Sequence, residues 1–192
     1  MKLRHSLMIT TGVLLGAAML AFAGCGGNDS ADSTASGAEF DRAFIDAMVP
    51  HHESAIAMAE AAKDAGLSDP ELLKVADDIL ATQQDEIDRM KQWRDEWFGS
   101  STIDPAGAAG LGMSESEMGM QHDADSMMNS TDADTDFAQL MITHHQGAIA
   151  MAELAKKQAG HDELKELADG IIDAQQREIG VMRPHAGGMN HG

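Results

Sequence analysis

The apolar residues of this chain recur at the spacing of an α-helix in four separate segments. Since successive residues lie about 100° apart around a helix, Phe44, Met48, Ala55 and Met58 all fall within about 60° of His51 and define one apolar stripe. No segment of the sequence shows the period-two alternation typical of strands. The pattern predicts four helices, at residues 39–65, 70–98, 134–159 and 162–183.

Residues that commonly begin and end helices stand at the predicted boundaries. Gly66 fits a C-cap, Ser68 or Asp69 fits an N-cap, and Pro70 fits the first helical position. Pro184 stops the last helix, because proline cannot continue one.

The chain contains an internal repeat. Residues 40–66 align with 136–160 at an offset of 93, and residues 69–90 align with 161–182 at an offset of 92. Each copy is predicted to form two antiparallel helices, and each hairpin has one apolar stripe to bury.

The fold class that follows is all-α, a four-helix bundle of two duplicated helical hairpins. Hairpin 1 (39–98) and hairpin 2 (135–183) are expected to form one domain. Residues 99–134 show no helical periodicity, so they are expected to be a flexible Met/His-rich linker or a long crossover.

The N-terminus has the features of an export signal. Lys2 and Arg4 precede an apolar run that stops at Cys25, so residues 1–24 are predicted to be a signal peptide. FAGC resembles a bacterial lipobox in which Cys25 is lipidated, while AFA offers an alternative cleavage site. Residues 25–38 would be a flexible tether. We expect an exported protein, lipid-anchored at the outer face of the bacterial cell membrane or else secreted in soluble form.

The remaining chain is strongly acidic. Without Lys2 and Arg4 it carries 11 basic and 32 acidic residues, a net charge of −21. This surface repels nucleic acid and is not attracted to anionic lipid, so the only membrane contact expected is the N-terminal lipid. Cys25 is the only cysteine, which excludes an internal disulfide and a thiolate metal cluster.

Two pairs of adjacent histidines occupy equivalent positions of the repeat. MVPHHESAIAM in the first copy becomes MITHHQGAIAM in the second, so methionines bracket each pair. His51 and His144 lie on the core-facing stripes, and His52 and His145 are turned about 100° onto the flanks.

Glutamines of the partner helices are expected opposite these histidines. Counted from the turns, Gln83 lies level with His51, and Gln176, with Gln175 beside it, lies level with His144. Since an unpartnered buried polar group costs about 1–3 kcal/mol, this layer needs partners. One hypothesis is a His–Gln hydrogen-bond network that fixes register, and the other is a pair of metal half-sites. The duplicated methionines favour the metal.

The donors in these pairs favour copper. Thioether sulfur is soft and selects Cu(I), and imidazole accepts Cu(I), Cu(II) and Zn(II). Structural zinc commonly uses thiolates, and the sequence has neither the E-x-x-H motif of bundle di-iron sites nor a calcium loop. The predicted copper ligands are His51, His52, Met48, Met58, His144, His145, Met141 and Met151.

Further candidates lie on the partner helices, in the linker and in a tail at 184–192. Flexible polar segments do not need methionine for packing, so a Met/His tract there indicates copper collection, compositional drift or oxidation scavenging. These secondary candidates are Gln83, Glu86, Met90, Glu178, Met182, Met113, Met118, Met120, His122, Met127, Met128, His185, Met189 and His191.

The repeated motifs resemble a known family. FIDAMVPHHESAIAMAEAA and FAQLMITHHQGAIAMAELA, followed by ILATQQDEIDRMKQW and IIDAQQREIGVM, resemble the domain-of-unknown-function family numbered 305. The resemblance covers about 40–98 and 135–183 and implies a ferritin-like four-helix bundle. Some members are exported copper-binding proteins linked to copper resistance. The resemblance also implies that the histidine pairs, their flanking methionines and the Q-x-x-E-I-x-x-M motif match the family's own.

We therefore expect an extracytoplasmic copper-binding protein that sequesters or buffers copper or confers resistance. No nucleophile–base pair and no acid–base carboxylate pair stands out, so no enzyme activity is expected. The alternatives are a structural or interaction bundle that binds no metal and a metal oxidase. The expected partner is the metal ion, with copper-handling proteins or a second copy of the chain as further candidates.

Overall fold

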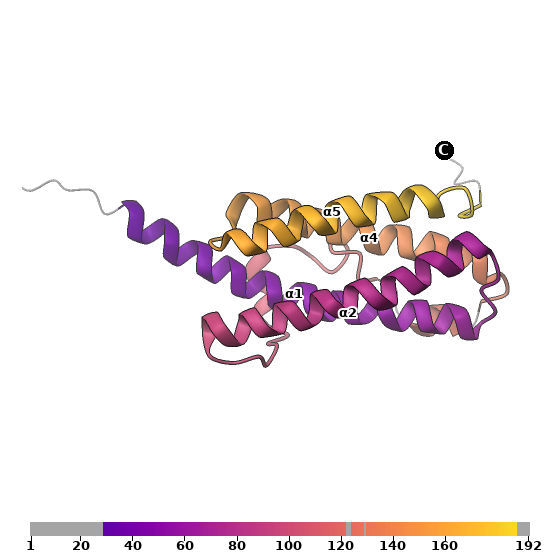
Figure 1. The fold of residues 1–192 in the computed structure, drawn as a ribbon, viewed down its shortest axis with the longest axis horizontal. Helices are drawn as coiled ribbons and strands as arrows, with labels where there is room; N and C mark the ends of the chain where they lie inside the picture. Colours follow the sequence, from indigo (N-terminus) through magenta and orange to yellow (C-terminus); the bar gives the residue numbers. More distant parts are fainter. Residues whose placement is uncertain (1–28, 122–123, 129, 188–192) are drawn as a thin grey trace, which may run out of the picture.

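The computed structural model describes residues 29–121, 124–128 and 130–187, and within these ranges the chain is all helical, without strands. The elements are α1 (Asp29–Asp64), α2 (Pro70–Phe98), the 3-10 helix η1 (Gly107–Leu111), α3 (Ala124–Met128), α4 (Ala133–Gln158) and α5 (Asp162–Met182). α1 packs against α2 and α4, and α4 packs against α5 (Figure 1). The four-helix bundle predicted from the repeat is confirmed.

The predicted caps are present at the turn of hairpin 1. The Asp69 side chain accepts hydrogen bonds from the backbone N–H groups of Glu71 (2.9 Å) and Leu72 (3.2 Å). Pro70 begins α2, where its missing N–H costs nothing. Gly66 has a φ of 102°, a conformation that residues with a Cβ rarely adopt.

A carboxylate near the start of each hairpin's first helix binds the turn of the other hairpin. Asp41 accepts from the backbone N–H groups of Gly160 (2.9 Å) and His161 (3.0 Å). Asp134, 93 positions later, accepts from those of Ser68 (2.8 Å) and Asp69 (3.1 Å). The two hairpins are thus fastened at both ends of the bundle by equivalent contacts.

The first helix is longer than predicted. α1 begins at Asp29, so residues 29–38, which we expected to belong to a flexible tether, are helical. A helix nucleated by packing extends at little cost, because each added residue gains a hydrogen bond. The first turns project beyond the rest of the bundle (Figure 1). The predicted signal peptide and Cys25 lie outside the described residues.

The segment between the hairpins is a packed crossover rather than a flexible linker. The core of the bundle consists of two clusters of buried apolar side chains. Leu111 is buried in one of them and Met127 in the other. At its start, the buried guanidinium of Arg94 donates to Asp46 (2.6 Å) and to the backbone oxygen of Ser100 (2.7 Å). The expectation of a flexible linker at 99–134 is therefore wrong for its described residues, because their apolar side chains complete the core.

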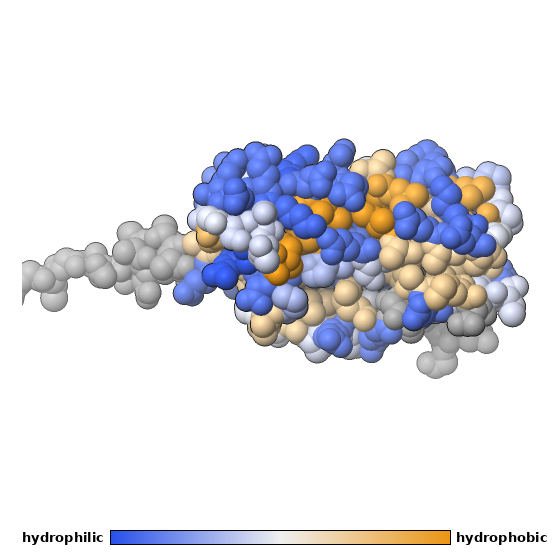
Figure 2. All heavy atoms as spheres, turned by 90° about the horizontal axis from the view of Figure 1, so that it is seen from below, coloured by the Kyte–Doolittle hydropathy of each residue, from blue (hydrophilic) through white to orange (hydrophobic). Residues whose placement is uncertain are grey.

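The face of the molecule in Figure 2 has both hydrophilic and hydrophobic areas. Figure 2 shows a band of hydrophobic atoms along the molecule between hydrophilic side chains. Among the described residues, the large hydrophobic side chains that are exposed are Met128 and Val181, so most of this band belongs to partly buried residues. In the described part of the chain, every helix is too short or too polar to cross a membrane.

Candidate metal centre

The two histidine pairs meet in the middle of the bundle. α1 carries His51 and His52, and α4 carries His144 and His145. All four side chains are buried, with at most 1% of their surface exposed. The rings of His51 and His144 lie against each other with their centroids 3.7 Å apart. The duplication thus brings one imidazole from each hairpin together at the interface between hairpins. We call these four residues the histidine layer.

Each of the other two histidines is held by a carboxylate of its own hairpin. Nε2 of His52 lies 2.7 Å from Oε2 of Glu86, and Nε2 of His145 lies 2.6 Å from Oε2 of Glu178. Because an ionised carboxylate only accepts, Nε2 donates the proton, and in the neutral ring Nδ1 then has the free lone pair. Metal-binding histidines commonly have such a carboxylate on the nitrogen that faces away from the metal.

The histidine layer and its flanking glutamines contain buried polar atoms that have no hydrogen-bond partner among the described residues. They are Nδ1 of His51, His52, His144 and His145, Nε2 of His144, and Oε1 of Gln83 and Gln175. Each such atom costs about 1–3 kcal/mol when nothing compensates it. The hypothesis of a His–Gln network, the less favoured of the two, is not supported: the glutamine oxygens are unpaired, and the bonded histidine nitrogens pair with Met118, Glu86 and Glu178 instead. The histidine layer therefore contains ring nitrogens whose lone pairs are available to a ligand.

Burial keeps the two central imidazoles neutral. Burial, together with the neighbouring His52, lowers the pKa of His51 to about 3. Burial, together with His51, lowers the pKa of His144 well below its ordinary value of 6.5. Neutral imidazole is the form that binds metal ions, so no proton has to leave these rings before coordination.

Buried methionines lie on both sides of the histidine layer. They fall into two core clusters, and each is at most 1% exposed. One cluster contains Met48, Met90 and Met151, and the other contains Met58, Met141 and Met182. Since the repeat relates Met48 to Met141, Met58 to Met151 and Met90 to Met182, both sides of the histidine layer carry equivalent thioethers.

The crossover covers the histidine layer from the side of α4. The backbone oxygen of Met118 accepts a hydrogen bond of 2.9 Å from Nε2 of His51. A Cβ on Gly147 would lie 2.0 Å from this oxygen, and a Cβ on Gly119 would lie 2.6 Å from the backbone oxygen of Thr143. Two glycines therefore allow the crossover backbone to lie directly on α4.

Gly147→Ala should push residues 118–119 away from α4. Because the added methyl group meets backbone rather than a flexible side chain, we expect a loss of about 1–3 kcal/mol in the free energy of unfolding. Urea denaturation measures this. Gly170→Ala on α5 is the matched control, since a Cβ there meets nothing within 4 Å and should stabilise by about 0.5–1 kcal/mol. Equal effects of the two substitutions would contradict the close contact.

The register within each hairpin differs from the prediction by about one helical turn. His52 pairs with Glu86, and Lys63 pairs with Asp77, whereas equal distances from the turn would have placed His51 opposite Gln83. In hairpin 2, Gln175 is buried and Gln176 is exposed. Packed helices are staggered so that ridges fit into grooves, and counting residues from the turn ignores this stagger.

The linker methionines have mixed environments. Met127 is fully buried, and Met113 and Met118 pack partly buried against a core cluster. Met120 joins Met118 in lining a cavity of about 210 Å³, whereas Met128 is exposed. The premise that linker methionines are not needed for packing is therefore wrong for Met127.

The remaining candidate ligands from the sequence are His185, near the end of the chain, and three residues that the structure does not describe. His122, Met189 and His191 are outside the described residues. His185 lies beside Asp69 and Glu71, a grouping that the sequence did not indicate because more than a hundred residues separate them. Only the arrangement of the bundle brings the end of α5 to the start of α2.

The chain belongs to the family described as "Domain of unknown function (DUF305)", whose family model matches residues 27–69 and 65–186. The resemblance read from the repeated motifs is thus confirmed. Among curated proteins, none matches this chain.

Several solved structures share both fold and sequence with the chain. CopM in the Cu(II)-bound form is 36% identical with a TM-score of 0.66, covering 76% of this chain and 95% of that one. CopM in the Cu(I)-bound form is 34% identical with a TM-score of 0.63, covering 75% and 93%. A candidate secreted DUF305 protein from Streptomyces coelicolor is 29% identical with a TM-score of 0.65, covering 74% and 89%.

Proposed function

We propose that this protein binds copper in the histidine layer and thereby sequesters or buffers it outside the cytoplasm. The observation that carries the proposal is the set of buried lone pairs. Nδ1 of all four histidines lacks a partner within the described part of the chain, and the opposite nitrogens of His52 and His145 are held by carboxylates. An apolar or hydrogen-bonded core of the same shape would be more stable, so a ligand accounts for this arrangement better than packing does.

The donors fit copper. Neutral imidazoles next to buried thioethers form a soft set that suits Cu(I), and the imidazoles also accept Cu(II). Among the described residues, no three of these imidazole nitrogens lie within 4.8 Å of one another. We therefore propose that each copper ion is held by a small number of imidazoles and completed by thioether sulfur. Met48, Met58, Met141 and Met151 are the proposed sulfur ligands, and Met90 and Met182 belong to the same clusters.

The similar proteins support this chemistry and an exported location. CopM has been crystallised with Cu(I), with Cu(II) and with silver, which resembles Cu(I) in its preference for soft ligands. A related protein is named as a candidate secreted one. The signal-like N-terminus agrees with export, and lipidation of Cys25 remains part of the proposal. A binding role without catalysis is proposed, since the histidine layer is covered by α2 and by the crossover.

Titration of the full chain with Cu(I) against a competing chelator tests this function. Glu86→Gln and Glu178→Gln should each weaken binding by about 10–100-fold, because losing the carboxylate removes the group that orients the imidazole. Glu60→Gln, on the exposed face of α1, is the control and should leave the affinity unchanged.

Unchanged Cu(I) affinity in both variants would contradict a role for the histidine layer. Oxygen uptake during Cu(I) loading is measured separately. If oxygen is consumed, the protein is an oxidase rather than a copper store.

A further inference from the structure

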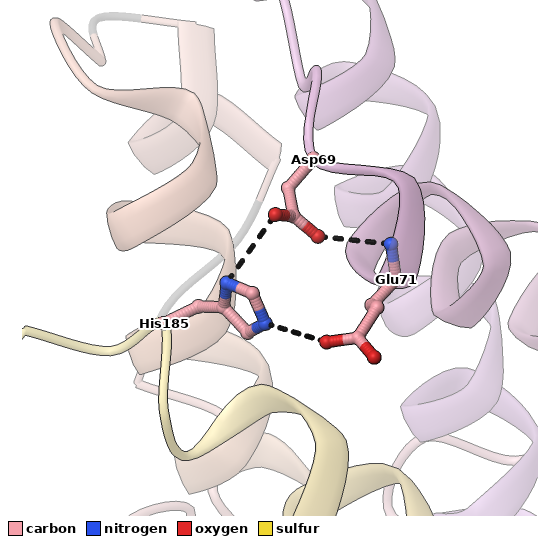
Figure 3. Close-up of side chains that lie close together, drawn as sticks. All are labelled: Asp69, Glu71 and His185. Atoms are coloured by element: carbon pink, nitrogen blue, oxygen red, sulfur yellow. Dashed lines mark hydrogen bonds and ion pairs between the residues drawn. The ribbon is translucent and has the colours of Figure 1, made fainter.

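A second group of donor side chains lies at one end of the bundle, away from the histidine layer. Asp69 begins α2, Glu71 lies in its first turn, and His185 follows α5. One ligand atom from each lies within 4.8 Å of the other two. Figure 3 shows the imidazole between the two carboxylates, with Nδ1 3.6 Å from Asp69 and Nε2 3.3 Å from Glu71.

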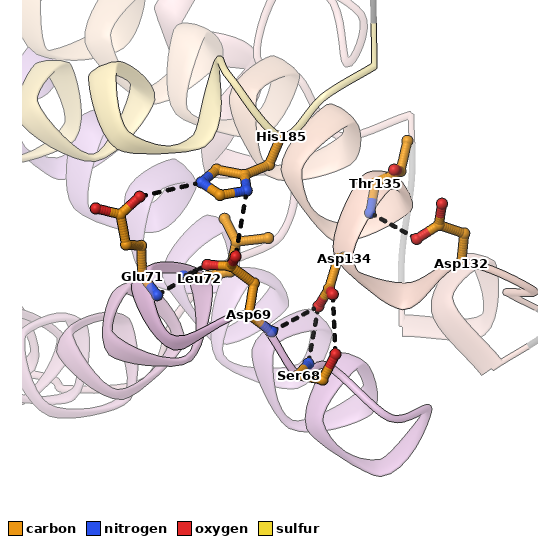
Figure 4. Close-up of polar contacts among 8 residues, drawn as sticks. All are labelled: Ser68, Asp69, Glu71, Leu72, Asp132, Asp134, Thr135 and His185. Carbon is orange, nitrogen blue, oxygen red and sulfur yellow. Dashed lines mark hydrogen bonds and ion pairs between the residues drawn. The ribbon is translucent and has the colours of Figure 1, made fainter.

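Asp69 is fixed in place by other contacts. One of its oxygens, Oδ1, accepts from the backbone N–H groups at the start of α2, which leaves Oδ2 directed at His185 (Figure 4). Its own backbone N–H donates to Asp134 of α4 (3.1 Å). The position and rotation of this carboxylate are thus determined before any ligand arrives.

His185 is also held by the backbone on both sides. Its N–H donates to the backbone oxygen of Met182 (3.0 Å), and the oxygen of the buried Ala186 accepts from the side chain of Gln139 (2.7 Å). Only Glu71, whose side chain is 73% exposed, is free to adjust. A metal ion binds one ring nitrogen only, so Nδ1 of His185 and Oδ2 of Asp69 are the two donors that already face each other, and the exposed Glu71 completes the site by moving from Nε2 towards them.

The repeat shows that this end of the bundle differs from its counterpart. At the other end, His161 occupies the position equivalent to Asp69; its ring stacks on Trp97 at 3.7 Å and its Nδ1 lies 2.6 Å from Asp41. That end is closed by an aromatic ring. At the Asp69 end, α5 stops at Met182 and the chain turns. The imidazole of His185 therefore follows the end of α5, whereas α2, the equivalent helix of hairpin 1, continues to Phe98.

The chemistry of this group differs from that of the histidine layer. It offers one imidazole nitrogen and two carboxylate oxygens, and no sulfur. In a tetrahedral site with bonds of about 2.0–2.1 Å, neighbouring ligand atoms lie about 3.3 Å apart. The separation of His185 Nδ1 from Oδ2 of Asp69, 3.6 Å, is close to this value. Two carboxylates also outweigh the partial positive charge of about +0.5 at the start of α2.

We propose that Asp69, Glu71 and His185 form a second metal site that binds a divalent cation of the Zn(II) or Cu(II) class, with solvent completing the coordination. Glu71 also lines a groove of about 470 Å³ between α2 and α5, and the same groove is lined by Glu178, the partner of His145. The site therefore lies beside a groove that is open to solvent, and this groove also exposes Glu178, which holds His145 of the histidine layer. It stands on its own donors and does not depend on copper binding in the core.

Zn(II) titration of the full chain against a chromophoric chelator tests the site. Glu71→Gln and His185→Gln should each lower the affinity for one bound equivalent of Zn(II) by at least about tenfold. The loss of a direct ligand should matter at least as much as the loss of a residue that only orients a ligand. Glu163→Gln, the same substitution at the equivalent position of hairpin 2, should leave that equivalent unchanged. In wild type, the NMR signals of the His185 ring should shift when Zn(II) is added.

Equal Zn(II) binding by wild type, Glu71→Gln and His185→Gln would overturn the site, as would an equal loss in Glu163→Gln. Circular dichroism of each variant establishes that the fold is intact. Cu(I) titration of the same variants separates the two proposals: a normal Cu(I) affinity with a lost Zn(II) equivalent supports the second site. Failure of Cu(I) binding in wild type, with the Zn(II) equivalent still dependent on Glu71, would overturn only the function proposed for the histidine layer.

Discussion

Replacing all four histidines of the layer by leucine should abolish tight Cu(I) binding to the bundle and change the stability of the metal-free protein little. The affinity measured against a chelator should fall by at least about 100-fold, because the direct imidazole ligands are lost. The free energy of unfolding should change little, because removing the unpartnered buried nitrogens and keeping apolar volume offsets the lost hydrogen bonds to Met118, Glu86 and Glu178. This combination of lost binding and kept stability distinguishes a ligand site from a structural network, whose removal would destabilise the bundle.

The matched control replaces the linker methionines by leucine. Met113, Met118, Met120, Met127 and Met128 can be exchanged together, because Met-to-Leu exchange in a core commonly costs less than about 1.5 kcal/mol. This variant should keep the high-affinity Cu(I) site. If the linker variant loses the site and the histidine variant keeps it, copper is bound by the crossover and the central proposal is wrong.

Acidification should destabilise the metal-free protein strongly. In the folded state the pKa of His51 is lowered to about 3 by burial and by His52, and the pKa of His144 is lowered well below 6.5 by burial and by His51. The unfolded chain takes up protons on these residues below about pH 6.5, whereas the folded chain does not. Their contribution is therefore complete above pH 6.5 and is lost as the pH falls towards the folded values.

The expected loss between pH 7.5 and pH 5 is about 2 kcal/mol for His51, from about 1.4 kcal/mol per unit of pKa difference, and His144 adds a loss in the same direction. This is a large share of the stability of an ordinary domain, which is about 5–15 kcal/mol. Urea denaturation at a series of pH values measures it. The His51→Leu/His144→Leu variant should lose this part of the pH dependence. An unchanged pH dependence in that variant would show that the two imidazoles are not held neutral by burial.

The sequence predicted the elements well because their signals are local. The apolar stripe around His51, the Asp69 and Pro70 cap and the stop near Pro184 each depend on a few neighbouring residues. The duplication added the global arrangement, since two hairpins with one apolar stripe each have few ways to bury both. The burial of His51 and His144 followed from the same periodicity, whereas His52 and His145, expected on the flanks, are buried as well.

The contacts between helices could not be predicted in the same way. The pairing of His52 with Glu86 depends on the stagger of α1 against α2, which the spacing along the chain does not contain. The hydrogen bond from His51 to Met118 depends on the path of a crossover without helical periodicity. The group of Asp69, Glu71 and His185 depends on where two chain segments far apart in sequence meet.

X-ray absorption spectroscopy of the full chain loaded with one equivalent of Cu(I) tests the central proposal most directly. The proposed centre predicts imidazole nitrogen together with thioether sulfur around copper, and loss of the nitrogen ligands when the four histidines are replaced by leucine. A copper ion surrounded by sulfur alone, with the same spectrum in wild type and in the histidine variant, would contradict it.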